Sequence, residues 1–202
     1  MLKVLQTQED QMLEYPFKLI KALAFIHKKL NLSQDEFKHY YEKNHAPLAN
    51  SLLTLESYER NYIHNYQAPF FESLGSISIF KYKSSKSLEV IGEQMASDAG
   101  DILRNDELNF MNVEKNFYLL TESNELSNKT FKKKIFYIAY TPDELFCLDG
   151  INGIIKISDN LILDHENIVG VPEYGITKSC VAKNLDQLQE EYPKTIIATS
   201  ES

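Results

Sequence analysis

The residues best suited to chemistry lie on one face of a predicted helix. Positions four apart share a helix face, so Phe37, Tyr41 and His45 are expected to line up, with Tyr40 and Leu48 beside them. A neutral imidazole can take a proton from an acidic carbon or a phenol, and a tyrosine hydroxyl can orient or protonate the developing oxyanion. The pattern predicts His45 as a general base supported by Tyr41 or Tyr40. Enolisation, cyclisation, decarboxylation or oxygenation of an electron-rich aromatic ring would fit, and none of these needs a bound metal.

The same histidine has a structural interpretation. Pro47 lacks an amide proton and disfavours helical backbone at Ala46, so the helix is expected to end or kink there. His45 would then lie in the last turn, where an imidazole can hydrogen-bond a free carbonyl and interact with the negative end of the helix dipole. The sequence therefore leaves two roles open for His45, a base in a pocket and a helix cap.

Composition and charge exclude several classes of function. The chain has 202 residues, of which 43% are hydrophobic and 25% charged, as in an ordinary globular protein. A net charge of −8 argues against nucleic-acid or anionic-membrane partners, because binding phosphates requires clustered Lys and Arg. Two cysteines and the lack of an apolar run of about 18 residues favour a soluble, cytoplasmic protein. The chain has no zinc motif and no glycine-rich phosphate loop, so we expect no cofactor.

The first half predicts an α+β unit of the ferredoxin-like kind. An apolar run at 19–26 indicates a buried strand, and Ser33 and Glu36 can form a capping box that starts a helix near Gln34. Strands are expected at 57–63, 76–82 and 116–120, and helices from 88 to a stop at Gly100 and at 102–111. This order is the split βαβ plan, an antiparallel sheet with both helices on one face. Its other face must be buried against a second sheet.

The second half predicts a shortened unit of the same type. A polar linker at 122–133 is followed by a strand at 135–140, a helix start at 141–146, a strand at 175–181, a helix at 185–192 and a strand at 195–199. We therefore divide the chain into units 1–122 and 134–202, the second packed on the first. Either this unit supplies the missing sheet in an intrachain, pseudo-dimeric barrel, which the strand order favours, or two chains pair as a homodimer.

Four segments resemble the EthD family of dimeric α/β-barrel proteins. Residues 28–37 are similar to the family's basic turn and first helix, 41–48 to its His-x-Pro helix end, 58–62 to its second strand, and 106–110 to its Asp-Glu-x-x-Phe segment. The matches follow the family's order over about residues 20–122. Lys28 and Asn31 depart from it, standing where the family often has Arg and Gly. Losing the arginine fork would weaken recognition of a carboxylate.

The resemblance implies a pocket between each sheet and its helices. It also implies cofactor-independent chemistry of the monooxygenase, cyclase, decarboxylase or isomerase type on a small aromatic or polyketide-like molecule. Besides the catalytic pair His45 and Tyr41, we expect a substrate-binding set made of Phe37, Tyr40, Lys28, Tyr58, Arg60 and Tyr62. The last three alternate onto one strand face, which lines the pocket or, with the opposite parity, faces solvent or helices.

Other interpretations remain open from the sequence alone. Asp106 and Glu107 fit either the solvated start of a turn or catalytic carboxylates. The barrel can bind or sequester a small metabolite without catalysis, which would leave binding intact after His45→Ala. A purely structural dimer module is the third alternative, and it would have a filled barrel with no pocket.

Overall fold

The computed structural model describes residues 19–65, 72–177 and 182–201. The first half contains β1 (Leu19–His27), α1 (Gln34–Tyr40), α2 (Ala46–Leu52), β2 (Tyr58–Asn65), β3 (Leu74–Tyr82), α3 (Ser85–Met95), α4 (Asp98–Glu107) and β4 (Phe117–Ser123). The second half contains β5 (Lys133–Tyr137), β6 (Ile154–Ser158), β7 (Leu161–Ile162), β8 (Glu173–Ile176), α5 (Ala182–Glu191) and β9 (Thr195–Glu201). Among the helices in these ranges, none combines the length and apolarity needed to cross a bilayer.

A single curled antiparallel sheet runs through both halves of the chain. Its strand order is β6-β8-β5-β9-β2-β3-β1-β4-β7. Each half contains a four-stranded set in a ferredoxin-like order, β9 joins β2 across the two halves, and the short β7 of the second half pairs with β4. Isolated bridges between Glu125 and Ser158 and between Leu161 and Gly170 link the far side of the sheet. The predicted α+β class is confirmed, and strands from one chain form both sides of the barrel.

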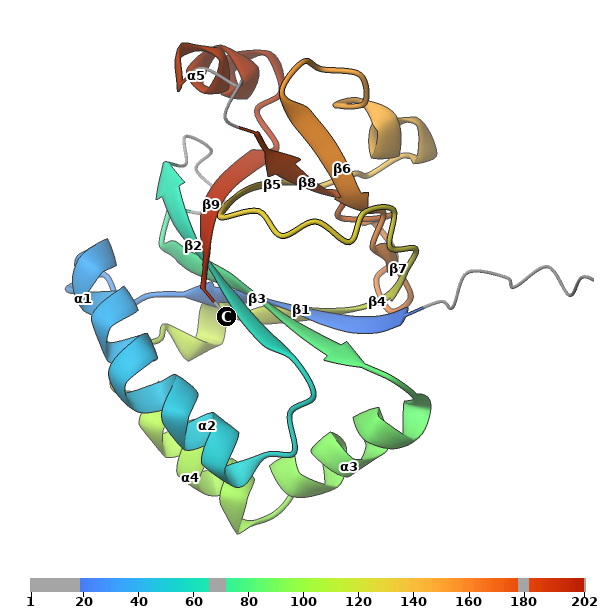
Figure 1. Ribbon diagram of the computed structural model, residues 1–202. Helices are drawn as coiled ribbons and strands as arrows, with labels where there is room; N and C mark the ends of the chain where they lie inside the picture. Colours follow the sequence, from blue (N-terminus) through green and yellow to red (C-terminus); the bar gives the residue numbers. More distant parts are fainter. Residues whose placement is uncertain (1–18, 66–71, 178–181, 202) are drawn as a thin grey trace, which may run out of the picture.

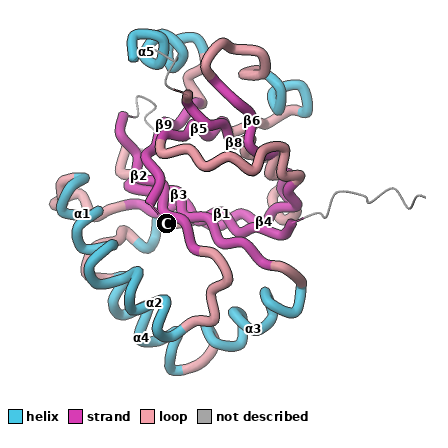
Figure 2. Tube along the Cα trace, in the orientation of Figure 1, coloured by secondary structure: helices cyan, strands magenta, loops and turns pink. Residues whose placement is uncertain are grey.

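The helices lie outside the barrel. Figure 1 shows α1 to α4 covering the outer face of the first-half strands and α5 covering the second half, and Figure 2 shows the strands of the two halves facing each other. Side chains alternate along β1, so Leu23 and Phe25 belong to the inner core while Ala24 and Ile26 pack under the helices. Phe25 and Phe117 stack inside the barrel with ring centroids 4.4 Å apart.

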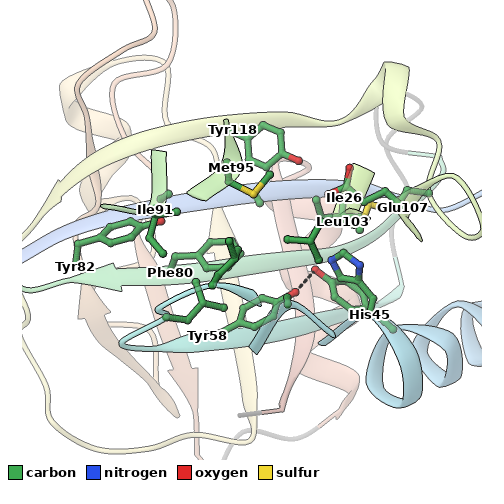
Figure 3. A pocket seen from close by; sticks show the side chains of 17 residues that line it. Ile26, His45, Tyr58, Phe80, Tyr82, Ile91, Met95, Leu103, Glu107 and Tyr118 are labelled. Carbon is green, nitrogen blue, oxygen red and sulfur yellow. Dashed lines mark hydrogen bonds between the residues drawn. The ribbon is translucent and has the colours of Figure 1, made fainter. Parts of the chain in front are cut away.

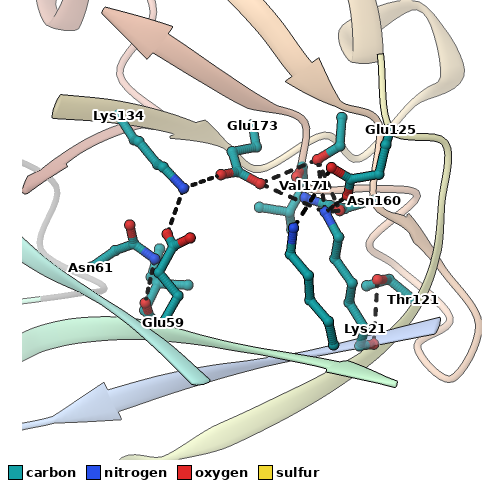
Figure 4. Close-up of polar contacts among 12 residues, drawn as sticks. Lys21, Glu59, Asn61, Thr121, Glu125, Lys134, Asn160, Val171 and Glu173 are labelled. Atoms are coloured by element: carbon teal, nitrogen blue, oxygen red, sulfur yellow. Dashed lines mark hydrogen bonds and ion pairs between the residues drawn. The ribbon is translucent and has the colours of Figure 1, made fainter. Parts of the chain in front are cut away.

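Charged side chains inside the barrel join the two halves (Figure 4). The Nζ atom of Lys21, which is fully buried, lies 3.2 Å from the Oγ atom of Ser158. Lys134 donates to Glu173 at 2.7 Å and also pairs with Glu59. A buried charge costs several kcal/mol, on the order of 3–5 for one left unpaired, so this network favours one alignment of the halves.

The structure corrects the predicted end of the first helix. The capping box of Ser33 and Glu36 is present, but the helix does not end at Pro47 and continues to Leu52. A π-helical turn, Tyr41–His45, lies between α1 and α2, and the Ala46 amide donates to the Tyr41 carbonyl. The wider turn lets the proline ring follow without clashing with the preceding turn. His45 therefore lies in the middle of a long helical segment.

Gly100 does not end a helix, and this prediction was also wrong. It lies inside α4, which begins at Asp98 after the capping residue Ser97. A Cβ atom at position 100 would lie 2.0 Å from the Met95 carbonyl oxygen, so the glycine allows the end of α3 to approach the start of α4.

The sequence pattern missed β6 and β7 entirely. Part of the strand expected at 175–181 falls on residues 178–181, which lie outside the described residues.

Candidate active site

A cavity of about 220 Å³ lies between the first-half sheet and the helices that cover it (Figure 3). Small side chains on β1, those of Ala22 and Ala24, leave room for it. Apolar side chains from β3, α3 and α4 form much of the wall, among them Phe80, Ile91, Met95 and Leu103. The structure thus has the pocket that the family resemblance implies, on the outer face of the sheet.

His45 lines this cavity from the π-helical turn. Its side chain is buried, and Nδ1 lies 2.8 Å from Oδ2 of Asp106 on α4. The other oxygen of Asp106 accepts a hydrogen bond from the Tyr40 hydroxyl, also at 2.8 Å. Because an ionised carboxylate can only accept, the proton belongs on Nδ1. This leaves the Nε2 lone pair without a hydrogen-bond partner among the described residues.

The surroundings keep His45 in its basic form. Burial in an apolar site lowers its pKa, while the hydrogen bond and negative charge of Asp106 act in the opposite direction. The imidazole is therefore neutral near pH 7 and can accept a proton. The alternative role as a C-terminal helix cap is wrong, because the helical segment runs on to Leu52.

Among the described residues, four tyrosines form part of the cavity wall, and two of them, Tyr41 and Tyr58, bond to each other. The Tyr58 hydroxyl donates to the Tyr41 hydroxyl at 2.8 Å, and Tyr41 lies 2.9 Å from Ser78 Oγ. Burial raises the pKa of Tyr41 to about 12, so its hydroxyl keeps its proton at neutral pH. A ligand that accepts a hydrogen bond from the Tyr41 or Tyr58 hydroxyl would have to replace one of these existing hydrogen bonds.

Glu107 adds a carboxyl group to the same cavity. It follows Asp106 at the end of α4, and its carboxyl group makes no hydrogen bond or ion pair with any other residue in the described part of the chain. Burial raises its pKa; the charge of Arg104 opposes this and that of Asp106 adds to it. A carboxyl group that retains its proton can donate a hydrogen bond as well as accept one.

The remaining predicted binding residues do not line the cavity. Phe37 and Tyr62 are buried in the aromatic cluster behind Tyr41, with the Phe37 and Tyr62 ring centroids 6.2 Å apart. Arg60 points to the helices, where its Nε and Nη2 atoms lie 3.0 and 2.9 Å from the carboxylate of Glu42. Tyr58, Arg60 and Tyr62 therefore share the face of β2 that lies under the helices, and of these three Tyr58 alone lines the cavity.

Tyr40 and Lys28 have supporting positions. Tyr40 acts through Asp106, as described above. Lys28 donates from Nζ to the Leu32 carbonyl at 2.7 Å, which stabilises the turn before α1. From the sequence, Glu107 fitted either the solvated start of a turn or a catalytic carboxylate, and the structure places it in the cavity wall.

Comparison with known proteins agrees with this architecture. Residues 29–114 match the EthD domain model, so the resemblance is confirmed. No curated protein matches. An EthD family protein from Bacillus halodurans C-125 is 19% identical with a TM-score of 0.38, covering 50% of this chain and 95% of that one.

Two further solved structures extend over most of the chain. A candidate chlorite dismutase has a TM-score of 0.53 at 8% identity, covering 92% of this chain and 95% of its own. A candidate monooxygenase from Lactobacillus acidophilus NCFM has a TM-score of 0.50 at 11% identity, with the same two coverages. At such low identity these similarities show the fold alone, and they show it for both halves together.

Proposed function

Because residues 29–114 form an EthD domain, we propose that this chain performs acid–base chemistry on a small aromatic or polyketide-like molecule in the cavity under its helices. The observation that carries the proposal is the arrangement of His45. The ring is buried, Asp106 holds Nδ1 at 2.8 Å, and Nε2 is left for a ligand. A similar fold in a candidate monooxygenase supports small-molecule chemistry of this general kind.

The proposed reaction begins with proton transfer to His45. Nε2 takes a proton from an acidic carbon or phenol of the substrate, and the electron pair moves onto the substrate's oxygen. Asp106 stabilises the resulting imidazolium through the Nδ1 hydrogen bond. The enolate or phenolate is a common first intermediate of isomerisation, cyclisation and oxygenation, so this step does not select among them. The residues named here need no cofactor to perform it.

Proton exchange on a simple ketone tests this step directly. 2-Tetralone carries an acidic C–H next to its carbonyl, and its loss of proton signal in D₂O can be followed by NMR. We expect the wild-type protein to accelerate exchange over buffer, and His45→Gln to lose about 100-fold or more of that acceleration. His39→Gln is the matched control, because His39 is exposed on the same helical segment.

The outcomes separate catalysis from binding. An unchanged exchange rate in His45→Gln would contradict the proposed base. Saturable binding of 2-tetralone without any accelerated exchange, retained in His45→Ala, would instead support the non-catalytic alternative, a barrel that binds or sequesters a small metabolite.

A further inference from the structure

The cavity offers no positive charge to a ligand. Neither lysine nor arginine occurs among the described residues that line it. Arg60, on the neighbouring strand, is occupied by two contacts with Glu42 and by its bond to the Tyr58 carbonyl at 2.7 Å. An anionic ligand would lose its hydration without gaining a counter-charge, which is strongly unfavourable.

Among the described residues of the wall, Glu107 is the one acidic side chain, and it is close to His45. His45 is hydrogen-bonded to Asp106, the residue immediately before Glu107 on α4. Figure 3 shows Glu107 and His45 at one end of the cavity and Tyr82 and Ile91 at the other. The imidazole and the carboxyl group are therefore gathered at one end, and the other end is formed by an aromatic ring and an aliphatic side chain.

We infer that Glu107 determines substrate specificity, selecting flat, uncharged molecules whose carbonyl oxygen accepts a hydrogen bond from its carboxyl group while an acidic C–H or O–H faces His45. The inference rests on the function proposed above and narrows its substrate class to neutral ketones, quinones and lactones. Carboxylate ligands are excluded from the cavity, since they would lie beside the carboxyl group of Glu107 with no lysine or arginine among the described wall residues to balance their charge. The apolar part of the ligand occupies the end of the cavity near Ile91.

This arrangement balances the proton transfer. Nε2 of His45 gains the proton from the substrate carbon, and the C–H electron pair moves through the carbonyl so that the oxygen becomes negative. The Glu107 O–H group donates to that oxygen, and passing its proton across gives the neutral enol. At the end of the step Glu107 has lost a proton and His45 has gained one, and no oxidant or reductant is consumed.

Few other titratable groups face Glu107. On its own helix, Arg104 pairs with Asp101 at 2.7 Å, and Asp106 is held by Tyr40 and His45. Tyrosines face the cavity from the other elements, namely Tyr41, Tyr58, Tyr82 and Tyr118. Tyrosines ordinarily titrate near pH 10 and burial raises the pKa of all four, so His45 and Glu107 are the described residues of the wall whose charge responds at lower pH.

The test compares three naphthalenes of similar shape by equilibrium binding to the full chain. 2-Acetylnaphthalene carries a neutral carbonyl, 2-naphthoate a carboxylate, and 2-ethylnaphthalene no acceptor. At mildly acidic pH we expect the wild type to bind the ketone at least about tenfold more tightly than the carboxylate and several-fold more tightly than the hydrocarbon. Burial raises the pKa of Glu107, and ketone binding should weaken as the pH rises and this carboxyl group ionises and loses its donor.

Substitutions at Glu107 isolate its contribution. Glu107→Gln keeps an uncharged donor, so ketone affinity should stay within about threefold and lose its pH dependence. Glu107→Leu should weaken ketone binding about tenfold and leave 2-ethylnaphthalene unchanged. Urea unfolding confirms that each variant is folded.

Equal binding of ketone and carboxylate by the wild type, or unchanged ketone binding in Glu107→Leu, would overturn the inference. Either result leaves the His45 exchange experiment unaffected, so the proposed function could still hold. Binding of none of the three compounds would count against the cavity itself, and therefore against both proposals.

Discussion

Replacing Asp106 by alanine removes the carboxylate that holds both His45 and Tyr40, each at 2.8 Å. During proton transfer His45 becomes a cation, and it loses a charge-assisted hydrogen bond of about 1.5–3 kcal/mol. If that bond is made fully in the transition state, 2-tetralone exchange should slow by about 10- to 150-fold. The pKa of His45 should also fall further, because the charge and hydrogen bond of Asp106 are the interactions that raise it.

NMR measures both quantities on the same samples. Asp106→Asn keeps the shape and one acceptor oxygen without the charge, so its rate should lie between those of the wild type and Asp106→Ala. Asp101→Asn is the control, since Asp101 is exposed on the same helix and its carboxylate pairs with Arg104 alone among the described residues. An exchange rate in Asp106→Ala within about twofold of the wild type, with the His45 titration unmoved, would refute the reasoning, since about 0.4 kcal/mol is too little for this bond.

Three further predictions concern stability, each read from urea unfolding. Burial, with a nearby lysine charge, lowers the pKa of His27 to about 4, so the unfolded chain binds a proton at His27 more readily than the folded chain does. The free energy of unfolding of the wild type, relative to that of His27→Gln, should therefore fall by about 3 kcal/mol as the pH falls from 7.5 to 4. A constant difference between the two proteins would contradict this. Glu173→Gln should cost on the order of 3–5 kcal/mol, because two buried lysines lose their shared counter-charge; a cost under about 1 kcal/mol would contradict it. Gly75→Ala should destabilise by about 1–3 kcal/mol, since its Cβ would lie 2.5 Å from the Phe37 ring, whereas Gly92→Ala, in open space on α3, should be neutral or stabilising by up to about 1 kcal/mol.

Much of the first half could be predicted because its patterns are local. The apolar run of β1, the alternation in β3 and the capping box at Ser33 depend only on neighbouring residues, and the two strands and the box are present. The continuation of the helical segment past Pro47 could not be predicted, because it depends on the π-helical turn that accommodates the proline and buries Tyr41 and His45. Short strands such as β7, held by pairing with β4, have too little pattern of their own.

The candidate site was only partly visible in the sequence. Helical spacing placed Tyr41 and His45 on one face, and both line the cavity. The contact between His45 and Asp106 joins residues 61 positions apart, so it depends on how α4 packs beside the first helical segment. Glu107 faces the cavity for the same reason. Such partners follow from tertiary packing and not from spacing.

The tautomer of His45 tests the central claim most directly. A long-range ¹H–¹⁵N correlation spectrum near pH 7.5 reports which ring nitrogen carries the proton, and His39 provides an exposed reference in the same spectrum. We expect a neutral ring protonated at Nδ1, with an Nε2 signal that shifts when 2-acetylnaphthalene is added. A ring protonated at Nε2, or an Nε2 signal that saturating 2-acetylnaphthalene leaves unmoved, would contradict the account.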